Sequence, residues 1–241
     1  AFVQPTIGME CAWVKVDVDG PPARHSPGMA YDSRRKVVVL FGGITGRTRS
    51  AVLYGDTWEW DGEEWRLVAT TGPTPRLGHA MVYDEARGVV VLFGGNDGTF
   101  KNDTWEWDGQ EWRQVASTGP PPRSRYGMAY DKKSGTILLF GGIPRDRNDT
   151  WIWDGKEWHQ VQTPDAPAGR SRLQLAYDES RERIVLFGGR LPNGLPTGDT
   201  WEWTGETWVR LCDTGPHERA RHGMVYDPRF GTLISAGVAF A

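Results

Sequence analysis

The chain has 241 residues, a formal net charge of −3 and 24% charged side chains. This is the balance of an ordinary globular surface without a block of Lys or Arg to coat a nucleic-acid backbone, so nucleic acid is not expected as a partner. The longest apolar runs, such as residues 37–41 and 184–187, are far shorter than the roughly 20 residues of a membrane helix, so membrane insertion is not expected either.

In chain order, the first predicted strand covers residues 28–31 and alternates small residues with Met and Tyr. Successive side chains of a strand point to opposite faces, so one face of this strand is small and the other is large. The second predicted strand, residues 37–41, is apolar at every position, as expected for a strand covered on both faces. Gly42 and Gly43 end it, where a positive φ or a close backbone approach requires glycine.

The third predicted strand carries Trp58 and Trp60, whose rings project from the same side because they are two residues apart. Asp61 and Gly62 form a strong hairpin signal that leads into a fourth strand beginning at Trp65. The predicted unit is therefore a meander of four antiparallel strands.

This unit recurs along the chain. The string Asp-Thr-Trp-(Glu/Ile)-Trp-(Asp/Thr)-Gly-x-x-Trp occurs four times, 46 to 50 residues apart, beginning at Asp56, Asp103, Asp149 and Asp199. First strands are also predicted at residues 80–83, 127–130, 174–177 and 223–226, and second strands at 89–93, 137–140 and 184–187. A fixed period of this length predicts a repeat architecture.

A sheet with one small and one large face can nest its large face on the small face of the next unit. Radial repetition of such sheets gives an all-β fold, the β-propeller. The Tyr-Asp, Phe-Gly-Gly and Asp-Thr-Trp elements recurring through residues 21–238 resemble kelch repeats. The resemblance implies a kelch-type propeller but no single activity, because the family includes the galactose oxidase central domain, sialic acid mutarotase, plant nitrile-specifier proteins and ubiquitin-ligase adaptors.

Five arginines open the repeats: Arg24, Arg76, Arg123, Arg170 and Arg219. The fifth repeat has a first strand at residues 221–226 and a degenerate second strand at 232–237, where the chain ends. Residues 13–16 align with residues 65–68 of a fourth strand. We therefore expect strands from both ends of the chain to complete one blade.

The prediction is a five-bladed, closed propeller in a single domain, residues 1–241. Its blades cover about residues 21–68, 69–115, 116–161, 162–211, and 212–241 with 1–20. A fragment of a larger ring is the alternative, because residues 2–7 lack the Asp-Thr-Trp string and kelch propellers more usually have six or seven blades. The chain begins at Ala1 without a leader, which fits either a cytoplasmic protein or an exported one after processing.

Residues that recur in every repeat are interpreted as packing residues. Twelve of the 13 tryptophans recur, which favours packing between blades over stacking on sugar rings. The aspartates that begin the repeated strings are expected to hold backbone amides of loops. The opening arginines are expected to make salt bridges or carbonyl contacts between blades rather than to bind a ligand.

Departures from the repeat indicate the candidate site. Two positions after the opening arginine stand Ser26, Gly78, Arg125, Arg172 and Arg221, and the connections between second and third strands hold Arg47, Arg49, Asn96, Arg145, Arg147 and Arg190. In a meander both sets emerge on one face of the ring. The candidate ligand-binding rim is therefore Ser26, Arg47, Asn96, Arg125, Arg145, Arg172, Arg190 and Arg221.

Arginine suits planar, bidentate recognition of carboxylate or phosphate. In kelch adaptors this face holds a peptide-binding basin, so the resemblance implies a basic basin here. The alternative is a set of solvated loop arginines without a ligand.

No nucleophile with its base, carboxylate pair or metal cluster stands out, so no catalytic residue is assigned. His79 and His222 share one repeat position and are interpreted as hydrogen-bonded spacers, and Cys11 and Cys212 as unpaired thiols. Neither the copper ligands of galactose oxidase nor the Glu-x-x-x-Asp-x-x-x-His pattern of nitrile-specifier proteins is present. No metal and no cofactor are expected.

The function favoured by these patterns is a non-catalytic binding module for a protein loop, an acidic peptide or a small carboxylated ligand. The alternative is a carbohydrate-binding, lectin-like propeller or a mutarotase-like enzyme, whose chemistry one or two polar residues of the basin can perform.

Overall fold

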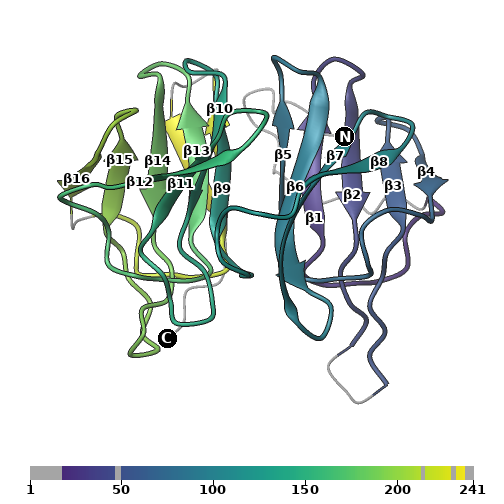
Figure 1. Ribbon diagram of the computed structural model, residues 1–241, viewed down its shortest axis with the longest axis horizontal. Helices are drawn as coiled ribbons and strands as arrows, with labels where there is room; N and C mark the ends of the chain where they lie inside the picture. Colours follow the sequence, from purple (N-terminus) through teal and green to yellow (C-terminus); the bar gives the residue numbers. More distant parts are fainter. Residues whose placement is uncertain (1–17, 47–49, 213–214, 229–231, 237–241) are drawn as a thin grey trace, which may run out of the picture.

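The computed structural model describes residues 18–46, 50–212, 215–228 and 232–236, the last segment by its backbone alone. Within these ranges the chain forms strands and turns, and none of it is a helix that could cross a membrane. Figure 1 shows the strands standing side by side, with the connections between second and third strands gathered at the lower edge.

Four sheets have four antiparallel strands each, in the order first, second, third, fourth. The strands are β1 (Gly28–Asp32), β2 (Val37–Phe41), β3 (Thr57–Trp60) and β4 (Trp65–Ala69); β5 (Ala80–Asp84), β6 (Val89–Asn96), β7 (Phe100–Trp107) and β8 (Trp112–Ala116); β9 (Gly127–Asp131), β10 (Thr136–Phe140), β11 (Thr150–Trp153) and β12 (Trp158–Val161); and β13 (Gln174–Asp178), β14 (Arg183–Phe187), β15 (Thr200–Trp203) and β16 (Trp208–Cys212). The meander predicted from the repeat is confirmed in each of these sheets.

A fifth sheet has two described strands, β17 (Gly223–Asp227) and β18 (Thr232–Ala236). These are the first and second strands predicted for the fifth repeat. The fourth strand expected at residues 13–16, and the segment at residues 2–7, lie outside the described residues.

The hairpin of β6 and β7 is longer than the prediction, which ended the second strand at Phe93. The ladder continues past the two glycines until Asn96 pairs with Phe100. The short loop at Asp97 and Gly98 closes this hairpin, and Gly98 has a φ of 115°. Continuation of the ladder is possible because the loop adds few residues between the two strands.

The sheets pack face to face, first strand against first strand, from β1 through β5, β9 and β13 to β17. Met81 and Tyr83 of β5 are buried in one cluster with Ala30 of β1 and Phe41 of β2. The large face of each sheet thus lies on the small face of the preceding sheet, which reverses the expected direction. Periodicity shows which residues share a face, but it does not show which neighbour that face meets.

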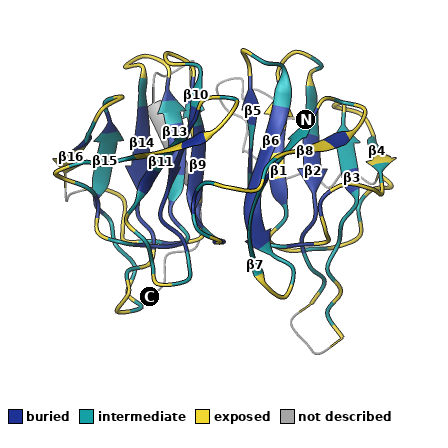
Figure 2. Cartoon of the chain, in the orientation of Figure 1, coloured by how far each residue is buried: buried dark blue, intermediate teal, exposed yellow. Residues whose placement is uncertain are grey.

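Burial follows this nesting. Figure 2 shows buried residues concentrated in inner strands such as β2, β6 and β14, while outer strands such as β4 and β16 carry exposed residues. Tryptophans that begin fourth strands reach back to the preceding sheet, where the indole N–H of Trp112 donates to the hydroxyl of Thr57 over 2.8 Å. Trp158 and Trp208 bond to Thr104 and Thr150 in the same way, at 2.9 Å each. These tryptophans therefore hold neighbouring sheets together.

Candidate binding surface

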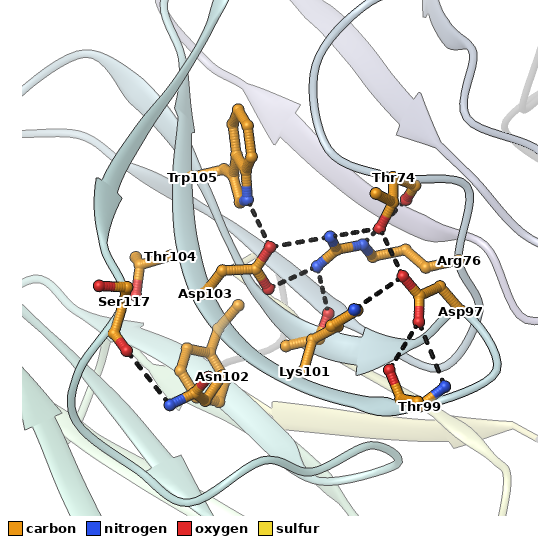
Figure 3. Close-up of polar contacts among 12 residues, drawn as sticks. Thr74, Arg76, Asp97, Thr99, Lys101, Asn102, Asp103, Thr104, Trp105 and Ser117 are labelled. Atoms are coloured by element: carbon orange, nitrogen blue, oxygen red, sulfur yellow. Dashed lines mark hydrogen bonds and ion pairs between the residues drawn. The ribbon is translucent and has the colours of Figure 1, made fainter.

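The opening arginines are structural. Arg76 donates two hydrogen bonds to the carboxylate of Asp103, at 2.7 and 2.8 Å, and one to the carbonyl of Gly94 at 2.9 Å. Trp105 donates its indole N–H to the same carboxylate over 2.7 Å (Figure 3). The same bidentate pairs are Arg24–Asp56, Arg123–Asp149 and Arg170–Asp199.

Two predictions about these pairs were wrong. Each of the four salt bridges lies within one sheet rather than between blades, and each of the four aspartates accepts from arginine and tryptophan rather than from loop amides. The expected carbonyl contacts between blades are present, because the backbone carbonyls of Arg76, Arg123 and Arg170 accept hydrogen bonds from glycines of the preceding sheet. Arg76 spans the second strand of its own sheet, donating to the carbonyl of Gly94 on the way to Asp103 on the third strand. Burial raises the pKa of Asp103, but the hydrogen bonds and charge of Arg76 outweigh it and hold the pKa below its usual range.

The two glycines link neighbouring sheets through the backbone. Gly95 donates its N–H to the carbonyl of Arg123 in the next sheet over 2.9 Å. Gly94 has a φ of 57°, and a Cβ there would stand 2.9 Å from that same carbonyl oxygen. The predicted requirement for glycine is confirmed in both of its forms, positive φ and close approach.

A ladder of backbone hydrogen bonds joins the residues two positions after the opening arginines. Gly78 N–H donates to Ser26 C=O at 3.2 Å, Arg125 to Gly78 at 2.8 Å, Arg172 to Arg125 at 2.7 Å, and Arg221 to Arg172 at 3.0 Å. Each residue comes from a different sheet, so together they trace an arc across all five sheets. We call Arg125, Arg172 and Arg221 the arginine arc.

The rest of the rim lies beside this arc. Backbone bridges join the segment before a first strand to the loop after the second strand of the same sheet, as in Leu77 with Asn96, Ser124 with Ile143 and Ser171 with Arg190. The two sets of connections that the sequence placed on one rim are therefore adjacent.

The arginine arc has no carboxylate partner within the described residues, in contrast to the opening arginines. Its guanidinium groups also act on one another. The pKa of Arg172 falls to about 10, first because of burial and then because of the positive charges of Arg125, Arg221 and Arg190. Burial and the charge of Arg221 likewise lower the pKa of Arg125. Arg172 and Arg125 remain cationic at neutral pH, so positive charge is concentrated along the arc.

A cavity of about 310 Å³ opens beside two members of the arc. Arg172, Arg190 and Arg221 line it together with Gly194, Pro196 and Ala220. Arg190 is held in place by its own loop, because its Nε donates to the carbonyl of Gly194 over 2.8 Å. Three predicted rim arginines from two consecutive repeats thus converge on one space.

Other predicted rim residues lie apart from this cavity. The Oδ1 of Asn96 accepts the N–H of Gly98 over 2.8 Å and so caps a turn. Ser26 is exposed on the ladder, and Arg145 is exposed in its loop. Arg47, with its neighbour Arg49, lies outside the described residues.

Sequence reasoning missed the backbone conformation of the arc. Arg125, Arg172 and Arg221 have φ values of 59°, 57° and 61°, in the left-handed region that glycine favours. Gly78, at the same repeat position with a φ of 65°, was the available signal. No sequence pattern marked the other residues of the cavity, Gly194, Pro196 and Ala220. They lie in loops that come together only in the folded chain.

His79 and His222 are buried spacers that pack against aromatic rings. His79 packs edge-on against Phe41 and His222 against Phe187, with ring centroids 5.5 and 5.4 Å apart. Neither ring nitrogen of either residue has a hydrogen-bond partner among the described residues. In the same part of the chain, no three His, Cys, Asp or Glu side chains gather as a set of metal ligands.

Comparison with models of known families identifies the Kelch repeats. The model of the KLHDC2/KLHL20/DRC7 Kelch-repeats domain matches residues 56–229, which is more than half of the chain. A search of curated proteins found no match. The matched segment runs from the Asp-Thr-Trp string of the first sheet to the residues after β17, and so contains the whole arginine arc.

Proposed function

We propose that this chain, which belongs to the Kelch-repeat family, binds an acidic segment of another protein at the arginine arc. Kelch-repeat domains are generally protein-interaction modules. The observation that carries the proposal is the ladder, because it sets Arg125, Arg172 and Arg221 on consecutive rungs, where none of them forms an ion pair with a carboxylate of the described residues. A partner with acidic side chains supplies the missing charge.

Backbone conformation supports a functional role for these side chains. A residue with a Cβ in the left-handed region is less stable by roughly 1 to 2 kcal/mol than in the right-handed one. Gly78 takes this conformation without that penalty. The three arginines carry this backbone penalty at equivalent rungs and also repel one another, and both effects oppose folding. Backbone strain of this kind is concentrated at binding sites.

The ladder also determines what the partner contacts. The N–H groups of all three arc residues and the C=O groups of Arg125 and Arg172 are used between sheets, so the side chains are the main groups left to recognise a ligand. Guanidinium groups bind carboxylates with two parallel hydrogen bonds, which suits Asp and Glu side chains. A small carboxylated ligand presents the same chemistry and is included in the proposal.

The test is a parallel screen of the wild-type chain on a peptide-display library and a glycan array. We expect enrichment of peptides rich in Asp and Glu, with affinity that falls as salt is added. Selection of glycans without acidic peptides would replace this proposal with the carbohydrate-binding alternative.

We also propose that the propeller has five blades and closes within residues 1–241. Met29 and Tyr31 on the large face of β1 are 51% and 56% exposed, and Val225 on the small face of β17 is 62% exposed. In every other pair of neighbouring sheets, the large face of one sheet is buried against the small face of the other. The Ser26 N–H and the Arg221 C=O are the two groups that a fifth ladder bond would join.

The position of Gly20 beside Trp65 supports the proposal that the closing strand comes from the N-terminal end of the chain. A Cβ on Gly20 would stand 2.8 Å from Cδ1 of Trp65, and one on Gly72 would stand 2.6 Å from Cδ1 of Trp112. Gly72 follows β4 and lies on the next sheet, so Gly20 holds the equivalent place before the first sheet. Residues preceding Gly20 are accordingly proposed as the fourth strand of blade five.

A further inference from the structure

The cavity beside the arc differs in charge from an ordinary surface hollow. Its 310 Å³ is lined by three arginines, Arg172, Arg190 and Arg221, and its other lining residues carry no charge. Arg190 comes from the loop after β14, whereas Arg221 belongs to the next repeat. The cations are thus assembled from separate segments, each fixed by backbone hydrogen bonds.

The backbone of all three arginines, and the side chain of Arg190, are held in place before a ligand arrives. The Nε of Arg190 donates to Gly194 C=O, which leaves its terminal nitrogens to serve as donors. Arg172 and Arg221 are joined by the ladder bond of 3.0 Å, so their Cα positions are set by the packing of the two sheets. Preorganised donors lose less conformational freedom when a ligand binds.

The charge balance favours a dianion. Arg125, Arg221 and Arg190 each act on Arg172 more strongly than Asp146, the carboxylate that opposes them. A carboxylate brings one negative charge and two acceptor oxygens, whereas a phosphate monoester brings close to two charges and three acceptor oxygens. Three guanidinium groups therefore match a phosphate more completely than they match a single carboxylate.

We infer that this cavity binds the phosphate group of a phosphorylated side chain in the partner protein, with Arg172, Arg190 and Arg221 as its ligands. The inference rests on the proposed function, because the phosphorylated segment is the acidic partner of the arginine arc. It adds the cavity and Arg190 to the recognition surface. It also implies that a kinase and a phosphatase acting on the partner can switch binding on and off.

The first experiment uses inorganic phosphate as the probe. Thermal unfolding is followed as phosphate is added at constant ionic strength, with disodium succinate as a dicarboxylate of similar charge. We expect a saturable rise in melting temperature with phosphate, a much smaller one with succinate, and no rise for Arg172→Gly or Arg221→Gly. Arg113→Gln is the matched control, since Arg113 is exposed on β8 and paired with Glu111, and it should respond like the wild type.

The second experiment uses an array of neutral peptides with one central residue, either phosphoserine, Glu or Ser. We expect phosphoserine peptides to bind at least tenfold more tightly than their Glu counterparts, and inorganic phosphate to compete. Equal responses to succinate and phosphate, or equal binding of Glu and phosphoserine peptides, would overturn the inference. Binding of inorganic phosphate without any phosphoserine peptide would also overturn it, in favour of a free phosphorylated compound.

The two proposals fail separately. If acidic peptides bind wild type and not the arc variants, while phosphate has no effect, the proposed function stands and the phosphate inference falls. If neither acidic peptides nor phosphate bind the folded protein, both proposals fall.

Discussion

The backbone N–H of Arg221 donates to the backbone carbonyl of Arg172 across 3.0 Å, although the two residues belong to neighbouring sheets. The same bond joins Arg172 to Arg125 and Arg125 to Gly78. The ladder therefore has two roles. It joins neighbouring sheets, and it also sets the backbone positions of the arginines in the candidate site. Substitutions at the arc can change binding while the ladder remains, because the ladder uses no side chain.

Replacing all three arc residues, Arg125→Gly, Arg172→Gly and Arg221→Gly, should not reduce stability. Glycine removes the left-handed strain of roughly 1 to 2 kcal/mol per residue, which offsets the roughly 0.5 to 1 kcal/mol of added unfolded-state entropy. It also removes the mutual repulsion of the cations. Equilibrium denaturation by urea measures the outcome. Unfolding of this variant in buffer would mean that the side chains hold the sheets together and that the binding proposal is wrong.

Tryptophan substitutions separate packing from hydrogen bonding. Trp107 is 1% exposed, so Trp107→Ala should destabilise the fold by roughly 3 to 5 kcal/mol. Its indole N–H donates to Glu59 over 2.9 Å, whereas the equivalent nitrogen of Trp153 has no partner among the described residues. Trp107→Phe should consequently cost about 1 kcal/mol more than Trp153→Phe. Equal losses in free energy of unfolding would contradict the hydrogen-bond assignment.

Acid should weaken the fold through its buried histidines. Burial, with a smaller contribution from a neighbouring arginine, lowers the pKa of His79 to about 3 and that of His222 to about 4. The unfolded chain has histidine pKa values near about 6.5, so it binds more protons than the fold between about pH 6.5 and 4. Stability should fall as the pH drops through this window, by up to about 1.4 kcal/mol per pH unit for each histidine.

A matched variant isolates this effect. Leu173 occupies the same repeat position in another sheet, so His79→Leu with His222→Leu places a residue that the fold already accommodates there. We expect a flatter dependence of unfolding free energy on pH between 6.5 and 4.5. The same slope in wild type and variant would assign the acid sensitivity to other groups. Asp103 and Asp199 have pKa values below their ordinary range, so they respond at lower pH.

Much of the fold could be predicted, because strand pattern and turn chemistry are local. Residues 37–41 are the second strand as expected, and Gly94 needs glycine for the predicted reasons. Pairings that depend on the path of a side chain through space could not be predicted. Arg76 crosses over Gly94 to reach Asp103 in its own sheet, and neither partner's position in the repeat shows that path.

The candidate site was less accessible to sequence reasoning. Arg125, Arg172 and Arg221 were selected together because they depart from the repeat at one position. Their left-handed backbone conformation and the ladder between them depend on the packing of neighbouring sheets. The local amino-acid sequence around each arginine does not specify that packing. Arg190 joins two of them at a cavity, while Asn96 serves a turn of its own hairpin.

Closure of the ring has its own test. If the proposed closure holds, deleting residues 1–16 should remove the strand proposed to complete blade five and leave that sheet with an open edge. Because a single cooperative domain loses several degrees per kcal/mol, the melting temperature should fall by many degrees. An unchanged melting curve for the shortened chain would contradict the closed five-bladed ring.

The most direct measurement of the central claim is the affinity of one selected acidic peptide for three proteins over a range of salt concentrations. They are the wild type, the glycine triple variant of the arc, and a control with Arg66→Gln, Arg113→Gln and Lys156→Gln. The control removes three positive charges away from the rim, since Arg66 and Arg113 are the second residues of β4 and β8 and Lys156 lies in the turn before β12. We predict that the wild type and the control bind alike and weaken with salt, while the folded arc variant does not bind. Equal binding by the arc variant, or equal loss by the control, would contradict the account.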